Sequence, residues 1–171
     1  IAIYNNLGVV NQMLGKYDKA VEYYDQAELV VSGKKEYLKD LADIYSNKGN
    51  IHFIRRSFDL ASGYYEKSIR IYKSMNLDDK GILLSLASTY LNAGIASLHD
   101  KKFDRALDYF NKSLELKSRN DLEGTELVYL NMAKTEAESG NTSKAQYYYI
   151  KSINSYISDF HDKYFRLAEI Y

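Results

Sequence analysis

The chain carries a recurring pattern of small and aromatic residues at helical spacing. Tyr4 and Gly8 lie four residues apart, which places a ring and a bare backbone position on one helical face. Further on, small, large and small residues follow at i, i+4 and i+7, as Ala20, Tyr24 and Ala27. Two helices with such faces can pack closely where Gly meets Ala, and the aromatic rings fill the space beside that contact. The pattern therefore predicts a helical hairpin.

This hairpin pattern returns along the rest of the chain. The leading tyrosines at positions 4, 45, 90, 129 and 171 recur about every 40 residues, a period typical of a solenoid. The residues expected to pack the later hairpins are Tyr45, Gly49, Ala61 and Tyr65, then Tyr90, Gly94, Ala106 and Phe110, then Tyr129, Ala145 and Tyr149.

On these residues the chain resembles the tetratricopeptide repeat family, whose pattern is an aromatic residue, Leu-Gly, then Ala, an aromatic residue and Ala. The first copy fits that pattern with Leu7-Gly8, whereas no proline closes any copy and the period exceeds the usual length of about 34 residues. The longer repeat is similar to the variants in kinesin light chains and bacterial signalling proteins. Later copies depart from the pattern at Lys48, Ala93 and Ala133, and at Ser68, Ser113 and Ser152 in place of the last Ala.

The resemblance implies an all-α fold, a right-handed α-solenoid of antiparallel helix hairpins (a TPR-like superhelix). We expect one array over residues 1–171, because each repeat packs only on its neighbours and the array has no single core. We also expect this array to be a fragment of a longer protein. The expected repeats cover about 1–41, 42–86, 87–125 and 126–167, with the start of a fifth at 168–171. The expected helices are 1–14, 18–31, 35–54, 59–75, 80–98, 104–118, 122–138, 143–157 and 162–171.

Turn signals support those boundaries. Asp18, Asp59, Asp104 and Ser143 are each expected to cap the helix that follows them. Between hairpins, one expected turn is Ser158-Asp159-Phe160-His161.

Composition and charge exclude several classes of function. Lys plus Arg and Asp plus Glu number 23 each, so the chain has no basic excess for nucleic acid or an anionic membrane. There is no cysteine, and His52, His99 and His161 have no second ligand at i+3 or i+4. No apolar run approaches the roughly 20 residues of a membrane span. We therefore expect no metal, no cofactor, no direct membrane contact and no enzymatic activity. The compartment is undetermined, with the cytoplasm favoured.

Asparagines two residues after the leading tyrosines are the main candidates for ligand contact. By the resemblance, the first helix of each hairpin lines a concave face, and asparagines here bond the backbone of an extended peptide. An amide carries donor and acceptor together, as a peptide unit does. The alternative is that these amides bond the neighbouring repeat or face water. The four asparagines are Asn6, Asn47, Asn92 and Asn131.

Neighbouring positions on the same face would supply specificity. They are expected to hold apolar anchors of a partner, although the same stripe could be core between repeats. Lys134 is nearly the only basic residue among them, which disfavours a receptor for chaperone carboxylate tails. Tyr147 and Tyr148 are further candidates for partner contact. The expected groove residues besides the asparagines of the series are Asn50, Phe53, Leu91, Ile95, Leu98 and Lys134.

These observations predict a non-catalytic scaffold whose concave groove binds an extended or helical segment of a partner protein or peptide, as the sensing or adaptor part of a larger signalling protein. The alternative is an architectural spacer or dimerisation array for an attached kinase, protease or DNA-binding domain, so self-association remains open. An RNA-binding repeat is disfavoured because such arrays need a uniform period and a basic face.

Overall fold

The structure is a computed structural model that describes residues 2–168, with side chains described up to residue 158. The described residues form α-helices and one short 3-10 helix, and they contain no strand. The all-α fold is therefore confirmed. The elements are α1 (Ala2–Met13), α2 (Tyr17–Val31), a 3-10 helix (Lys35–Tyr37), α3 (Leu38–Ile54), α4 (Phe58–Lys73), α5 (Lys80–His99), α6 (Phe103–Arg119), α7 (Thr125–Glu138) and α8 (Thr142–Ala168).

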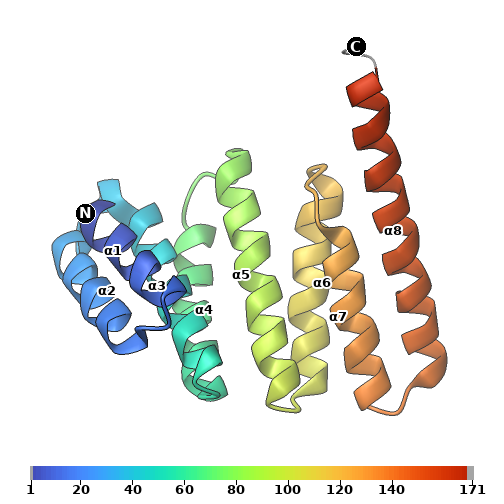
Figure 1. Ribbon diagram of the computed structural model, residues 1–171, viewed down its shortest axis with the longest axis horizontal. Coiled ribbons are helices and arrows are strands. Elements are labelled where there is room, and N and C mark those ends of the chain that lie inside the picture. Colours follow the sequence, from blue (N-terminus) through green and yellow to red (C-terminus); the bar gives the residue numbers. More distant parts are fainter. Residues whose placement is uncertain (1, 169–171) are drawn as a thin grey trace.

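The helices pair into four hairpins that stack in chain order. Each odd-numbered helix packs against the even-numbered helix that follows it, and that second helix packs against the first helix of the next hairpin. Figure 1 shows the resulting array, with α1 and α2 at one end and α8 at the other. The predicted solenoid of antiparallel hairpins is confirmed.

The turn inside each hairpin has one repeated geometry. Its central residue adopts a left-handed conformation, with φ of 71° at Gly15, 60° at Arg56, 58° at Lys101 and 88° at Gly140. The next backbone N–H reaches back to close the preceding helix, as from Ser57 to the His52 carbonyl oxygen at 2.9 Å. This geometry turns the chain directly into the second helix.

The predicted caps of the second helices are wrong. Asp18, Asp59 and Asp104 lie in the first helical turn, one residue after the helix begins, and Ser143 has the same place in α8. Two of the carboxylates instead bond the turn of the next hairpin. Asp18 pairs with Arg55 at 2.5 Å, and Asp59 pairs with Lys102 at 2.7 Å.

A side-chain cap does occur where none was expected. Asp79 precedes α5, and its carboxylate accepts from the backbone N–H groups of Gly81 at 2.7 Å and Ile82 at 3.2 Å. These bonds satisfy two of the free donors at the helix start.

The last helix is longer than predicted. The expected turn at 158–161 is wrong, because α8 continues from Thr142 to Ala168 and includes the start of the helix expected at 162–171. The segment Ser158-Asp159-Phe160-His161 contains neither proline nor glycine, so nothing in its backbone chemistry requires the helix to end. Residues 169–171, where the fifth copy was expected, lie outside the described residues.

The core is divided into clusters between neighbouring hairpins. One joins α2 to α3, the next is centred on α4 and α5, and the third joins α5, α6 and α7. Within three hairpins a buried ring packs closely against a glycine, as Tyr24 against Gly8, Tyr65 against Gly49 and Phe110 against Gly94. This division is what a solenoid requires, since each unit completes the core of its neighbour.

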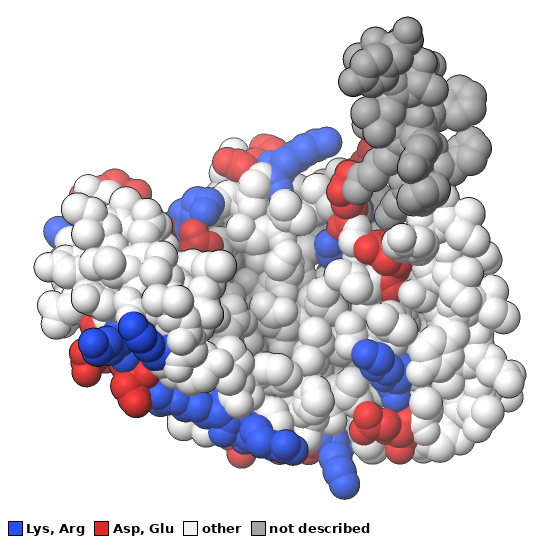
Figure 2. Space-filling view, in the orientation of Figure 1, with Lys and Arg blue, Asp and Glu red and all other residues white. Residues whose placement is uncertain are grey.

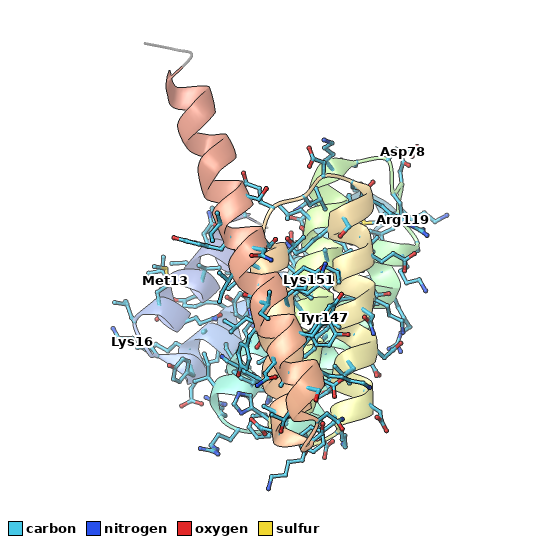
Figure 3. All side chains as sticks on the ribbon, turned by 90° about the vertical axis from the view of Figure 1, so that its right-hand side faces the viewer. Met13, Lys16, Asp78, Arg119, Tyr147 and Lys151 are labelled. Carbon is cyan, nitrogen blue, oxygen red and sulfur yellow. The ribbon has the colours of Figure 1, made fainter. Side chains whose placement is uncertain are left out.

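The fourth hairpin packs differently from the others. Ala133 replaces the glycine, and Tyr149, expected to be the packing ring, is 38% exposed. Tyr148, expected to contact a partner, instead packs on the third cluster and stacks on Tyr129 at 6.4 Å. Tyr147 is exposed and lies beside Lys151 (Figure 3).

Helix α5 contradicts the expectation that no apolar run approaches the length of a membrane span. By length and composition alone it could cross a membrane, and 61% of its apolar window is buried inside the array. It packs against both α4 and α6, so its apolar character is that of a core helix.

The serines that replace the last alanine have a role that the pattern did not reveal. The Ser113 hydroxyl donates to the Ala87 carbonyl oxygen, and that of Ser152 to the Glu126 carbonyl oxygen, both at 2.8 Å. These bonds tie the two helices of a hairpin together. The Ser68 hydroxyl is buried, and no described residue hydrogen-bonds to it.

We expect alanine to have opposite effects at two of these serines. Ser68→Ala should raise the free energy of unfolding by about 1 kcal/mol, because it removes a buried hydroxyl that has no partner. Ser113→Ala should lower it by about 1 kcal/mol, because it removes a satisfied bond. Urea unfolding of the two variants beside the parent measures both changes. A loss of stability in Ser68→Ala would contradict the prediction that the two substitutions act in opposite directions.

Candidate functional site

The first helices of the hairpins lie on the inside of the curve. Helix α1 contacts α3, α3 contacts α5, and α5 contacts α7, whereas the second helices make no comparable contact within the described part of the chain. Closer spacing on one side bends the array toward that side. Figure 2 shows this face hollowed over α5, with few charged residues in the hollow.

A cavity of about 360 Å³ opens on this face between α1, α3 and α5. Its walls carry mostly amides and hydroxyls, together with one carboxylate and one exposed apolar side chain. Such groups can both donate and accept hydrogen bonds, as an extended peptide backbone requires. The lining residues are Asn5, Asp43, Ser46, Asn47, Tyr72, Leu84, Ser85, Ser88 and Thr89.

Two of the four expected asparagines link neighbouring repeats by long hydrogen bonds. The Asn47 amide donates to the Asn5 amide oxygen at 3.5 Å, and that of Asn92 donates to the Asn50 amide oxygen at 3.4 Å. Both are longer than an ordinary N–H···O bond. Among the described residues, no donor reaches the amide oxygen of Asn47 or Asn92. These half-buried amides therefore keep capacity for another ligand.

The other expected polar groove residues differ in their surroundings. Asn6 is exposed on α1. Asn131 donates to the Leu127 carbonyl oxygen of its own helix at 2.7 Å. Asn50 also accepts from the Tyr65 hydroxyl at 2.8 Å, and Lys134 is exposed. The four asparagines are therefore not a uniform ladder, since their bonding partners change from repeat to repeat.

The expected apolar anchors lie largely in the core. Leu98 is buried in the third cluster, and Leu91 and Ile95 pack against that cluster. Phe53 packs on the second cluster, and its ring lies 5.2 Å from that of His99. The prediction that this stripe is open to a ligand is wrong for Leu98, and the alternative of core between repeats describes it.

The sequence did not single out several of the residues that line the cavity. Ser85, Ser88 and Thr89 recur at i, i+3 and i+4, so they share one face of α5 with Leu84 beside them. This polar stripe on an otherwise apolar helix is the sequence feature that could have identified these cavity residues. Asn5, rather than Asn6, supplies the amide from α1.

Asp43 gives the cavity its one carboxylate. Lys39 approaches it at 2.8 Å, and the Tyr72 hydroxyl donates a hydrogen bond to it. Burial and the neighbouring Asp43 carboxylate raise the pKa of the Tyr72 hydroxyl, so this phenol remains a donor at neutral pH. The bond fixes Asp43 at the wall of the cavity.

The described histidines pack against aromatic rings. His52 stacks on Tyr64 at 5.1 Å, and burial together with nearby cations lowers its pKa. His99 contacts Phe53 and Phe58, and the side chain of His161 lies outside the described residues. Within the described residues, no group of three or more His, Cys, Asp or Glu could hold a metal ion.

Comparison with known proteins gives a family match. The family model described as Tetratricopeptide repeat matches residues 1–74 and 85–158. A search of curated proteins finds no match.

Solved structures share the fold at low identity. BtubC from P. vanneervenii is 23% identical with a TM-score of 0.78, over 92% of this chain and 63% of BtubC. The apo form of RapI is 16% identical with a TM-score of 0.83, over 94% of this chain and 57% of RapI. The Rap conjugation gene regulator of plasmid pLS20, solved with the Phr* peptide, is 18% identical with a TM-score of 0.72, over 88% of this chain and 41% of the regulator. The chain thus spans less than two thirds of each of these proteins.

Proposed function

Because the chain belongs to the tetratricopeptide repeat family, we propose that it is a non-catalytic scaffold whose concave face binds an extended segment of a partner protein. The polar cavity between α1, α3 and α5 is the observation that carries this proposal. Such a scaffold suits the sensing or adaptor part of a larger signalling protein. The plasmid regulator with the same fold, solved with its Phr* peptide, supports a peptide as the class of partner.

The two half-buried amides supply the main-chain contacts. Asn47 and Asn92 each have a free amide oxygen and a weakly held amide N–H, so each can exchange its long inter-repeat bond for contacts to one peptide unit. The exchange costs little, since the bonds at 3.4 and 3.5 Å are weak. The ligand would therefore run across α3 and α5.

The other cavity residues suggest the side chain that the site accepts. Asp43 places a carboxylate on the wall, and Leu84 places an exposed apolar side chain on the opposite helix. A Lys or Arg side chain of the ligand fits between them, because its stem can lie on Leu84 while its charge approaches Asp43. We expect a micromolar dissociation constant, about −8 kcal/mol, because a shallow groove must also order a flexible peptide.

The proposal is tested with peptides selected from a displayed random library and then measured by calorimetry. Asn47→Ala combined with Asn92→Ala should weaken binding by about 10- to 100-fold, since each lost hydrogen bond contributes roughly 0.5–1.5 kcal/mol. Asn131→Ala is the matched control, because that amide bonds its own helix, and it should leave binding unchanged. Circular dichroism confirms equal helicity of all variants. If the double variant binds as tightly as the parent, or if no peptide is selected, the proposed groove is wrong.

A further inference from the structure

Ion pairs join the turns of neighbouring hairpins along one edge of the array. Figure 1 shows the turns that link α3 to α4, α5 to α6 and α7 to α8 on this edge. At the first two junctions, a carboxylate of a second helix pairs with a cation of the next turn, Asp18 with Arg55 at 2.5 Å and Asp59 with Lys102 at 2.7 Å. Both acids lie three residues after the left-handed residue of their own turn. Each of these two junctions therefore holds a cation at one fixed place in the repeat.

The third junction has the carboxylate but lacks the cation. Asp104 has the same position in α6 that Asp18 and Asp59 have in α2 and α4. The cations of the other junctions come from the residues just before and just after the left-handed residue, and these positions hold Ser139 and Asn141 in the last turn. Among the described residues, no hydrogen bond or ion pair reaches the carboxylate of Asp104.

A cavity of about 490 Å³ opens at this third junction. Asp104 lines it from α6, beside the half-buried Phe103 and Leu107. From α7 comes Glu136, a charged residue that is only 3% exposed. A charged partner stabilises such a desolvated carboxylate more than it stabilises a surface acid. The walls belong to the third and fourth hairpins, so the cavity lies between two hairpins and not on an outer face of the array.

The cations around the cavity leave both carboxylates available. Lys102 and Arg105 are already paired with acids of the second hairpin. Lys144 only approaches Glu136, at 3.8 Å, and its side chain is 69% exposed. Lys101 is exposed in the turn itself. An incoming cation can therefore displace Lys144 into solvent without breaking a close ion pair.

We propose that this cavity binds an arginine side chain of a partner protein, which supplies the cation that the third junction lacks. The first two junctions show the chemistry, because a protein guanidinium or ammonium group occupies the equivalent place there. A guanidinium suits the cavity better than an ammonium, since its five N–H donors can serve carboxylates on two walls. Its aliphatic stem can lie against Phe103 and Leu107. The Asn141 amide oxygen is a further acceptor, because no described donor bonds to it.

An NMR titration of the isotope-labelled chain with N-acetylarginine N-methylamide tests the proposal. We expect saturable shifts of the backbone amides around Asp104 and Asn141, with a dissociation constant in the millimolar range for this single side chain. The citrulline analogue has the same shape without the charge and should bind about tenfold more weakly or less. Equal binding of the two probes would overturn the proposal.

Free arginine distinguishes the two sources of this side chain. The blocked probe and free arginine should bind equally, because the cavity is proposed to recognise the side chain alone. Much tighter binding of free arginine would assign the site to the amino acid and overturn the assignment to a partner protein.

Variants of the third junction locate the site. Asp104→Asn should weaken binding of the blocked probe about tenfold, since it removes one charged acceptor. Asp78→Asn is the matched control, because Asp78 is also an exposed acid at the start of a helix hairpin, and it should bind as the parent does. Asn141→Arg places a cation where Lys102 lies in the preceding turn, so it should fill the cavity and abolish binding. All three positions are exposed, and circular dichroism confirms that the variants keep their helices. Unchanged binding in Asp104→Asn or Asn141→Arg would overturn the proposal.

A variant of the concave cavity separates this proposal from the proposed function. That cavity shares no residue with the third junction, but it too is expected to accept a basic side chain, beside Asp43. The probe can therefore also shift amides of α3 and α5. Asp43→Asn should remove those shifts and keep the ones around Asp104 and Asn141, whereas Asp104→Asn should do the reverse. The two proposals can thus fail independently.

Discussion

Replacing Gly94 with alanine is expected to destabilise the array by about 1–3 kcal/mol, even though alanine favours helices over glycine. A Cβ atom at Gly94 would lie 2.4 Å from the Cε1 atom of Phe110, well inside van der Waals contact. Phe110 is fully buried in the third cluster, so its ring cannot move aside without disturbing α7. The loss is measured as the change in the urea unfolding midpoint and slope.

Gly63→Ala is the matched control for this substitution. Gly63 also lies inside a helix, but no atom outside its own helical backbone lies within 4 Å of a Cβ built there. This variant should gain up to about 1 kcal/mol from helix propensity alone. Combining Gly94→Ala with Phe110→Leu should cost less than the sum of the single changes, because the smaller side chain relieves the clash. Stabilisation by Gly94→Ala would show that the ring yields and that this contact does not require glycine.

The same contact explains why the hairpins could be predicted from the sequence. Gly8, Gly49 and Gly94 meet an aromatic ring that follows 16 residues later in each case, as Tyr24, Tyr65 and Phe110. Both partners belong to one hairpin, and each lies on a face set by helical spacing. This short-range pattern is present in the first three hairpins, so its repetition makes it recognisable in the sequence.

The ends of the helices depend on contacts that spacing does not encode. Asp18 and Asp59 are good capping residues, yet each lies inside its helix and bonds a cation from the next hairpin. Whether a carboxylate caps or pairs is decided by the left-handed turn before it and by the position of the neighbouring repeat. Similarly, Ser158 and Asp159 are typical turn residues, but α8 continues through them.

The groove was predicted less well because a first helix has neighbours on several sides. Helix α5 packs against α4 and α6 and also contacts α3 and α7. Spacing places Leu91, Ile95 and Leu98 on related faces, but it does not reveal that neighbouring hairpins cover them. The half-buried Ser85 and Ser88 line the cavity instead.

An ion cluster around the buried Lys48 links the first two hairpins. Lys48 is buried, and its ammonium group lies 2.5 Å from Asp25 and also contacts Glu28. The Tyr45 hydroxyl donates to the same Glu28 carboxylate at 2.8 Å. Burial alone would raise the pKa of Glu28, but the hydrogen bonds from Lys48 and Tyr45 outweigh it and lower that pKa. Burial would lower the pKa of Lys48, and its two carboxylate partners raise it instead.

We expect Glu28→Leu to lower the free energy of unfolding by about 3 kcal/mol at neutral pH, because it leaves Lys48 buried with one partner lost. Combining Glu28→Leu with Lys48→Leu should restore stability to within about 1 kcal/mol of the parent, since both charges are then absent. The later hairpins support this variant, because the buried residues Ala93 and Met132 hold the position that Lys48 has in the second.

The pH dependence separates the charge effect from packing. The folded pKa of Glu28 lies below its unfolded value, so its stabilisation is fully present above the unfolded pKa and is lost as pH falls through the folded pKa. The difference between the parent and Glu28→Leu should therefore shrink in acid, while the double variant should lack this contribution. Lys48 has a raised pKa, so its contribution is present below its unfolded pKa and is lost as pH rises through the folded value. Urea unfolding of the parent, Glu28→Leu and the double variant at pH 7 and at about pH 3 measures the Glu28 contribution and its loss in acid. An equal cost of Glu28→Leu at both pH values, or a double variant as unstable as the single one, would mean that packing rather than charge joins these hairpins.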